Sequence, residues 1–184
     1  MQVATLRLFR KVHRLMGAVL FIFFFVVAIT GVLLGWKKNT NGWLLPATTK
    51  GTSTNLAVWK PIAQLHSIAD SVLLHRVDKN LALDLDRIDI RKDKGIVKFV
   101  YAKHYWEVQL DGATGQALQV NLRKSDFIED IHDASYLDAY FNTKGEPIKL
   151  TYTLIMGVAL FLFCATGFWL WYGPKVLRNK KRGL

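Results

Sequence analysis

The chain has 184 residues, of which 51% are hydrophobic and 21% are charged, and its formal net charge is +11. This composition excludes intrinsic disorder, because disordered chains lack apolar residues. The single cysteine excludes an intramolecular disulfide and a cysteine-rich metal site. In a soluble protein the positive charge would indicate a nucleic-acid partner, but here most of it lies at the two ends of the chain.

Two long uncharged segments predict membrane-spanning helices. Residues 15–36 and 150–173 contain no charged side chain, and about 20 apolar residues are enough to cross the hydrocarbon core of a bilayer. We therefore expect transmembrane helices over residues 15–36 and 147–173. The first segment is too long for a cleaved signal peptide, whose apolar region spans about 7–15 residues.

The basic residues predict how the helices are oriented. Residues 1–14 carry four Lys or Arg side chains and residues 174–184 carry five, and neither tail has an acidic residue. Because cytoplasmic flanks are enriched in Lys and Arg, both basic tails are expected in the cytoplasm and residues 37–149 outside it. The net charge then reflects topology and attraction to the lipid bilayer, and no nucleic acid is expected as a partner.

The segment between the spans begins with a linker and a helix. Residues 37–54 are polar and rich in Asn, Gly, Ser and Thr, which is typical of a linker. A helix is predicted over about residues 56–74, starting near position 59 or 60, since Pro61 fits only a first helical turn. Its apolar face has helical spacing and comprises Ile62, His66, Ala69 and Leu73. His66 is expected to be a core histidine, whereas two others, His75 and His104, are expected in loops.

Strands are predicted after this helix. Apolar residues recur with period two around residues 87–91, 97–101, 106–110 and 118–120. A short connection at residues 102–103 predicts a hairpin, and the run Asp111–Gly115 predicts a turn. The fold class is therefore α+β: one helix packs on a small antiparallel sheet over residues 55–122, held by the two transmembrane helices.

A juxtamembrane amphipathic segment is predicted over residues 123–146. Ser125 is expected to cap its short helix, and Ile128, Ile131, His132 and Ser135 share one helical face. The simplest role for His132 in this segment is a hydrogen bond to Asp130 or Asp133.

The order of these elements resembles the PepSY domain and the PepSY-associated transmembrane family. In the module, the resemblance rests on the aromatic strand Tyr105–Val108, which leads into the Asp-Gly turn and the Thr114-Gly115 pair. In the spans, it rests on His13-Arg14, Gly17, Thr30-Gly31, Ile131–Tyr136 (with Ala134 where a glycine is common) and Thr166–Trp171. The resemblance covers nearly the whole chain. It implies a bacterial inner-membrane protein with residues 37–149 in the periplasm, a minimal two-span version of relatives with four spans.

The resemblance also implies a cofactor. Larger relatives include ferric-siderophore reductases that hold haem b through membrane histidines, and histidine is an ordinary ligand of haem iron. The candidate ligands are His13, at the inner end of the first span, and His132, outside the membrane before the second. They are at least a membrane thickness apart, so one iron cannot bind both. A homodimer would pair two copies of His13 at an inner haem and two copies of His132 at an outer one. Alternatively, His13 lies in the headgroup layer beside Arg14.

Small residues predict where the spans pack, because they let helix backbones approach closely. The candidate helix-packing residues are Gly31 and Gly35 in the first span and Gly157 and Gly167 in the second. The face of the second span that carries these glycines also contains Thr153, Leu160 and Cys164. Cys164 is expected to be a packing residue, because a reactive thiolate needs polar, electropositive surroundings.

Two functions are consistent with these features. No catalytic residues are predicted, since the sequence has no hydrolytic constellation and no phosphate-binding loop. The first hypothesis is a non-catalytic accessory subunit. Its module binds a peptide at a free strand edge or an envelope partner, and its spans pack against another membrane protein. The alternative is a haem b-binding electron-transfer protein that works as a homodimer, a reductase component with no metal beyond haem iron.

Overall fold

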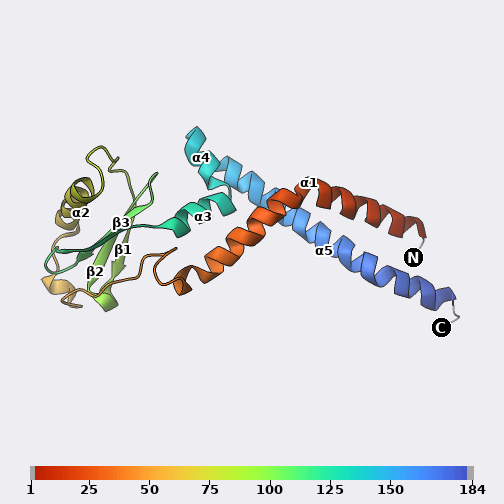
Figure 1. Ribbon diagram of the computed structural model, residues 1–184, viewed down its shortest axis with the longest axis horizontal. Coiled ribbons are helices and arrows are strands. Elements are labelled where there is room, and N and C mark those ends of the chain that lie inside the picture. The colour runs from red at the N-terminus through yellow and green to blue at the C-terminus, as the bar shows by residue number, and fades with distance from the viewer. Residues whose placement is uncertain (1–2, 182–184) are drawn as a thin grey trace. The chain divides into compact units, whose positions relative to one another are not determined.

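A computed structural model describes residues 3–181 of the chain (Figure 1). The chain divides into two compact units. One comprises the chain up to Gly31 and from Asp130 onward, and it contains most of the two long helices. The other, Val32–Glu129, contains the sheet.

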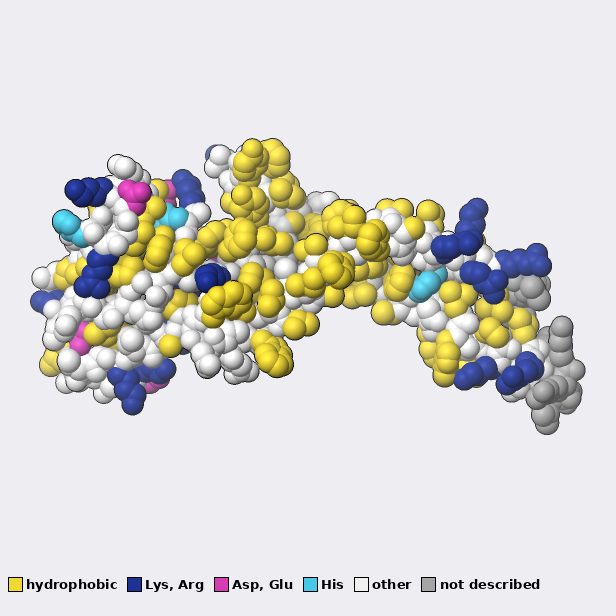
Figure 2. Space-filling model, in the orientation of Figure 1, with side chains coloured by type: hydrophobic (Ala, Val, Ile, Leu, Met, Phe, Trp, Pro, Cys, Tyr) yellow, Lys and Arg dark blue, Asp and Glu magenta, His cyan; other side chains and the backbone are white. Residues whose placement is uncertain are grey.

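The first unit is built on an antiparallel helix pair. Helices α1 (Val3–Trp36) and α5 (Pro147–Lys181) run in opposite directions, so the beginning of α1 and the end of α5 lie at the same end of this unit (Figure 1). Both helices continue into the basic tails, beyond the predicted spans at residues 15–36 and 147–173. Figure 2 shows dark blue Lys and Arg side chains gathered at that end.

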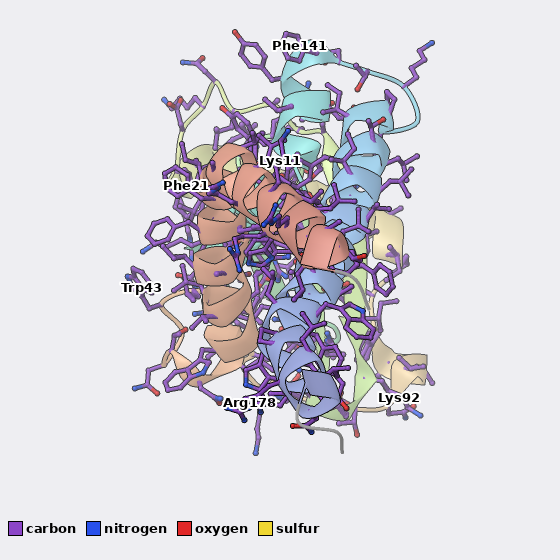
Figure 3. The ribbon with its side chains drawn as sticks, turned by 90° about the vertical axis from the view of Figure 1, so that its right-hand side faces the viewer. Lys11, Phe21, Trp43, Lys92, Phe141 and Arg178 are labelled. Carbon is purple, nitrogen blue, oxygen red and sulfur yellow. The ribbon has the colours of Figure 1, made fainter. Side chains whose placement is uncertain are left out.

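Both long helices expose apolar side chains along their length. Their candidate membrane spans are Ala4–Asn39 and Pro147–Asn179. Phe21, Phe25 and Phe161 are 61%, 64% and 71% exposed, and Figure 3 shows Phe21 projecting away from α5. Apolar surface of this extent is favourable in lipid and costly in water.

Two short helices precede α5. Helix α3 covers Lys124–His132 and α4 covers Ser135–Phe141. The predicted cap at Ser125 is wrong, because α3 begins one residue earlier and Ser125 lies inside it. Within α4, the buried carboxylate of Asp138 accepts hydrogen bonds from the backbone N–H groups of Ile148 (3.1 Å) and Lys149 (2.7 Å). It thereby satisfies amides of the first turn of α5 that have no partner within the helix.

The second unit contains the predicted α+β module. Its four strands are antiparallel and pair in the order β1-β2-β3-β4. They are β1 (Leu85–Arg91), β2 (Ile96–Tyr101), β3 (Trp106–Asp111) and β4 (Ala117–Leu122). Helix α2 (Ile62–Arg76) covers one face of the sheet. Its buried residues pack against apolar side chains of β2 and β3 in one core, made of Leu65, Ala69, Leu73, Val97, Phe99, Tyr101, Val108 and Leu110.

Helix α2 begins at Ile62, later than the predicted position 59 or 60. Pro61 is the N-cap residue, and the residue before a proline is driven away from helical backbone angles, so Lys60 cannot start the helix. His75 lies in the last turn of α2 and not in a loop. His66 is half-buried, and its ring stacks on Phe99 with 5.6 Å between ring centroids, as expected for a core histidine.

Residues 44–54, part of the predicted linker, bind to the other face of the sheet. The backbone N–H groups of Thr49 and Thr52 donate to the side chains of Gln109 (3.1 Å) and Asp111 (2.7 Å). The N–H of Gly51 donates to the carbonyl of Lys94 at 2.8 Å. Side chains alternate between the two faces of a strand, so polar residues of β3 face this segment while their apolar neighbours face α2. The hydrogen bonds explain why these polar side chains are buried.

Candidate functional site

The two candidate histidines each contact a threonine on a different helix of the first unit. His13 is in α1, and its Nδ1 atom lies 2.9 Å from Oγ1 of Thr166 in α5. His132 is the last residue of α3, and its Nδ1 atom lies 2.7 Å from Oγ1 of Thr30 in α1. The ring of His13 also stacks on Phe163, with 3.9 Å between ring centroids. Both rings are half-buried.

The threonine hydroxyls favour one tautomer of each histidine ring. Oγ1 of Thr30 lies 2.7 Å from the carbonyl of Val26, and Oγ1 of Thr166 lies 2.7 Å from the carbonyl of Leu162. A hydroxyl has one hydrogen to donate. Because that hydrogen goes to the helix carbonyl, the hydroxyl oxygen accepts from the histidine Nδ1–H. Each neutral imidazole therefore presents a lone pair on Nε2, which is a form that can bind a metal.

A glycine follows the threonine in both pairs and lies beside the imidazole. A Cβ atom added at Gly167 would lie 3.3 Å from Cε1 of His13, and one at Gly31 would lie 3.7 Å from Cε1 of His132. The first distance leaves too little space for a side chain unless the ring moves. In both pairs the threonine lies at Nδ1 and a glycine lies beside Cε1, but only Gly167 is in tight contact with its imidazole.

The two histidine–threonine pairs lie far apart along the helices. The stretch of α1 from His13 to Thr30 is about 25 Å long at 1.5 Å per residue. One metal ion therefore cannot bind both histidines of a chain. Among residues 3–181, no group of three or more His, Cys, Asp or Glu side chains is placed to hold a metal ion. Each chain offers one histidine nitrogen at each end of the helix pair.

A family model described as the PepSY-associated TM region matches residues 10–183. This match includes both histidine–threonine pairs and the whole sheet. The chain belongs to the PepSY-associated TM family. No curated protein and no solved structure matches it. Membership in the PepSY-associated TM family confirms the predicted resemblance, and the structure confirms an α+β module joined to two helices fit to span a membrane.

Acidic residues beside His132 in this PepSY-associated protein bind other groups. The Ser135 hydroxyl oxygen lies 2.6 Å from Oδ1 of Asp133 and 3.0 Å from Oδ1 of Asp130, so its single hydrogen has two alternative acceptors. Burial alone would raise the pKa of Asp133, but hydrogen bonds from Ser135 and the ammonium of Lys149, 3.1 Å away, hold that pKa below its ordinary value. The hydrogen bond expected from His132 to Asp130 or Asp133 stays a prediction, and the structure places the Thr30 hydroxyl at the Nδ1 atom of His132.

The glycines predicted to pack have different surroundings within one chain. Gly31 and Gly167 lie beside the two histidine rings, whereas a Cβ atom added at Gly35 or Gly157 would meet nothing within 4 Å in residues 3–181. Cys164 is exposed on α5, as are two other residues of its predicted packing face, Thr153 and Leu160. Gly35, Gly157 and this face stay predicted contacts with another protein or with a second copy.

The family motifs in the sequence contained both parts of each site but not their pairing. His13 and Thr30-Gly31 are both in α1, yet they do not contact each other, and each belongs to a different pair. The antiparallel arrangement of the two spans could have predicted the pairing of His13 with Thr166, because it brings the beginning of the first helix beside the end of the second. The role of Asp138 at the start of α5 had no recognisable signal in the sequence.

Proposed function

We propose that the protein binds haem b as a homodimer and transfers electrons across the membrane. Two copies of His13 would bind an inner haem and two copies of His132 an outer one. The observation that supports this proposal is the repeated histidine–threonine pair, which orients two Nε2 lone pairs. Histidines that bind metals commonly donate their other ring N–H to a neighbouring acceptor, which fixes the ring and raises its basicity.

The residues of the chain fit haem when a second copy is present. Each chain supplies one imidazole nitrogen at each end, so a bis-histidine site requires a second chain. The exposed face of α5 around Gly157 and Cys164 offers small side chains for close helix contact. Exposed phenylalanines such as Phe161 offer apolar surface that would suit a porphyrin or a second helix.

Haem iron supplies one-electron reduction and oxidation when it is bound. The chain's own residues hold and orient the sites: Thr166 and Thr30 keep the imidazole lone pairs available, and the apolar helices exclude water. With the basic tails in the cytoplasm, His13 would lie near the cytoplasmic surface and His132 near the periplasmic one. His13 would then hold haem near the cytoplasmic surface and His132 would hold haem near the outer one, and bound haem would supply one-electron chemistry at both.

Single histidine variants test this proposal. Removing one proposed ligand would affect only the haem that it holds, so His13→Ala and His132→Ala should each retain about half of the wild-type haem per chain. The matched control is His75→Ala, which changes an exposed histidine of α2 and should retain all of it. Haem content unchanged in both ligand variants would refute the choice of ligands. Loss of all haem from a single variant that still folds as a dimer would refute the independent two-site arrangement.

A second candidate function is that of a non-catalytic accessory subunit for a peptide or an envelope partner. It is supported by the sheet, whose edge strands are β1 and β4. An edge strand accepts an extended peptide through its unpaired main-chain groups. Purification from membranes in a mild detergent would distinguish the two functions. A colourless protein that copurifies with a stoichiometric partner supports the accessory role, whereas a lone monomer argues against both candidates.

A further inference from the structure

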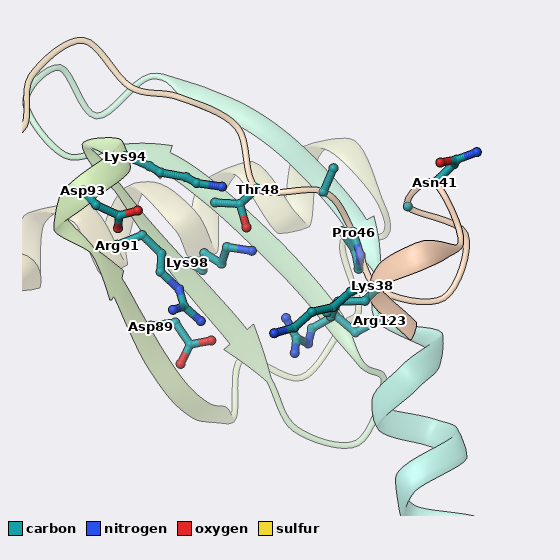
Figure 4. Close-up of a pocket in the computed structure, with 13 residues that line it drawn as sticks. Lys38, Asn41, Pro46, Thr48, Asp89, Arg91, Asp93, Lys94, Lys98 and Arg123 are labelled. Carbon is teal, nitrogen blue, oxygen red and sulfur yellow. The ribbon is translucent and has the colours of Figure 1, made fainter. Parts of the chain in front are cut away.

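A pocket lies on the face of the sheet opposite α2, within the second unit (Figure 4). Its volume is about 540 Å³, which is in the range of small-molecule sites. Residues of the 38–48 segment form one side, and residues of β1, β2 and the turn between them form the other. Five lining residues are basic, and they are Lys38, Arg91, Lys94, Lys98 and Arg123. Two acidic residues, Asp89 and Asp93, also line the pocket.

The floor of the pocket contains two buried cations that share one buried carboxylate. Lys98 and Arg123 are 4% and 8% exposed. Both contact the fully buried Glu107, with Nζ of Lys98 3.4 Å from Oε1 and the Arg123 guanidinium on Oε2. Arg123 also binds Asp126 at 2.7 Å, but that carboxylate is shared with Arg87. Lys98 and Arg123 therefore share Glu107, whereas Arg87 has further carboxylate partners in Asp86 and Asp89.

The rim of the pocket contains cations without an ion-pair partner among the described residues. The side chains of Lys38, Arg91 and Lys94 make no hydrogen bond or ion pair with any residue in the range 3–181. Figure 4 shows Arg91 extending beside Lys98 over the sheet. Burial lowers the pKa of Lys98, Glu107 opposes this effect, and the positive charges of Arg123 and Arg91 lower the pKa further. Arg91 and Arg123 are thus close enough to repel Lys98.

An oxyanion in the pocket would remove this repulsion. A guanidinium binds phosphate through two parallel hydrogen bonds, and a lysine ammonium binds it as a point charge. The excess of basic over acidic residues in the lining favours an anion with more than one negative charge. The volume exceeds that of a phosphate group alone, and Leu45, Pro46 and Ala47 supply surface for the rest of a molecule.

We propose that this pocket is a binding site for a phosphate-bearing ligand, held by Arg91 and Lys94 at the rim and Lys98 at the floor. Two sources of phosphate are compatible with its position. One is a soluble phosphate ester or pyrophosphate. The other is the headgroup of an anionic phospholipid, because Lys38 is only two residues beyond the end of α1, within about 7 Å along the chain. The proposal involves only residues 32–129 and is independent of haem binding.

Thermal unfolding of the full-length protein in a neutral detergent tests the proposal, with inorganic pyrophosphate as the probe. A ligand that binds only the folded protein raises its stability in proportion to the logarithm of ligand concentration above Kd. We expect a saturable increase in Tm with pyrophosphate that sodium chloride of equal ionic strength does not reproduce. Absence of such an increase for pyrophosphate and for the lipid probe below would overturn the proposal.

Two variants distinguish anion binding in the pocket from anion binding at the basic tails. Arg91→Gln removes a cation that has no partner, so the Tm without ligand should stay close to wild type, while the pyrophosphate Kd should rise about tenfold or more, as for loss of a charge-assisted hydrogen bond. Lys79→Gln is the matched control, because Lys79 is exposed and lies outside the pocket. Equal affinity in the two variants would place the anion elsewhere, for instance on the tails, and would refute the site.

A lipid arm distinguishes the source of the phosphate. Short-chain dihexanoyl phosphatidylglycerol is titrated in place of pyrophosphate, with dihexanoyl phosphatidylcholine as the zwitterionic control. Tighter binding of phosphatidylglycerol than of pyrophosphate, lost in Arg91→Gln, would identify a lipid headgroup. The reverse order would identify a soluble phosphate compound. Binding of both anionic probes that is insensitive to Arg91→Gln would overturn the proposal.

Discussion

Replacement of Thr30 by valine tests whether this threonine orients His132. Valine has nearly the shape of threonine without the hydroxyl, so the change removes the 2.7 Å hydrogen bond to Nδ1 of His132 and leaves the packing in place. An unpaired, half-buried N–H costs about 1–3 kcal/mol, so the ring will turn or exchange its proton between the two nitrogens. Loss of such a partner typically weakens metal binding about 10–100-fold. We expect this decrease in haem affinity at the outer site, which His132 would form, and no decrease at the inner one.

Two measurements read out this change separately. Ring ¹⁵N chemical shifts of the detergent-solubilised protein should show His132 protonated on Nδ1 in the wild type and in Thr30→Ser, which keeps the hydroxyl, and a mixture of tautomers in Thr30→Val. Haem titration should show weaker binding at one site in Thr30→Val. The corresponding change Thr166→Val should affect the His13 site instead. Unchanged tautomers and unchanged haem affinity in both valine variants would refute the reasoning.

Three further predictions concern stability, measured by denaturant unfolding in detergent. Ala134 has a φ of +64°, which is unfavourable for residues other than glycine, so Ala134→Gly should raise the free energy of unfolding by about 1 kcal/mol; a decrease would contradict this. Glu107→Gln leaves the buried cations Lys98 and Arg123 without their shared carboxylate and should cost about 3–5 kcal/mol; a cost below about 1 kcal/mol would show that the cluster contributes little. Burial alone would raise the pKa of Asp111, but hydrogen bonds from Thr114 and Thr52 hold it below the ordinary value of 3.8. Its contribution to stability is therefore complete above that value and lost as the pH falls through the lowered pKa. Asp111→Asn should show a smaller loss of stability below about pH 4 than the wild type, and an equal loss would argue against this role.

The parts of the fold that the sequence predicts are those with a strong hydrophobic pattern. The two long uncharged segments give the membrane helices, and period-two alternation gives all four strands. The turn at Asp111–Gly115 is also predicted correctly, because its residue types tolerate the backbone angles that the turn requires. In each case the signal is local and repeats over several residues.

The parts that the sequence does not predict depend on contacts between distant residues. The polar composition of residues 44–54 resembles a linker, but its backbone binds Gln109 and Asp111 some 60 positions away. The start of α2 depends on one proline and its effect on the preceding residue. The pairing of His13 with Thr166 likewise joins residues 153 positions apart. None of these contacts leaves a periodic pattern.

The visible absorption spectrum of the wild-type protein tests the proposed function most directly. The protein would be produced in cells supplied with haem and purified in a mild detergent as a folded dimer. Two histidine-ligated haems per dimer predict a Soret band, together with α and β bands that sharpen when dithionite is added. A folded, dimeric protein with no absorption in the visible range would contradict the haem proposal.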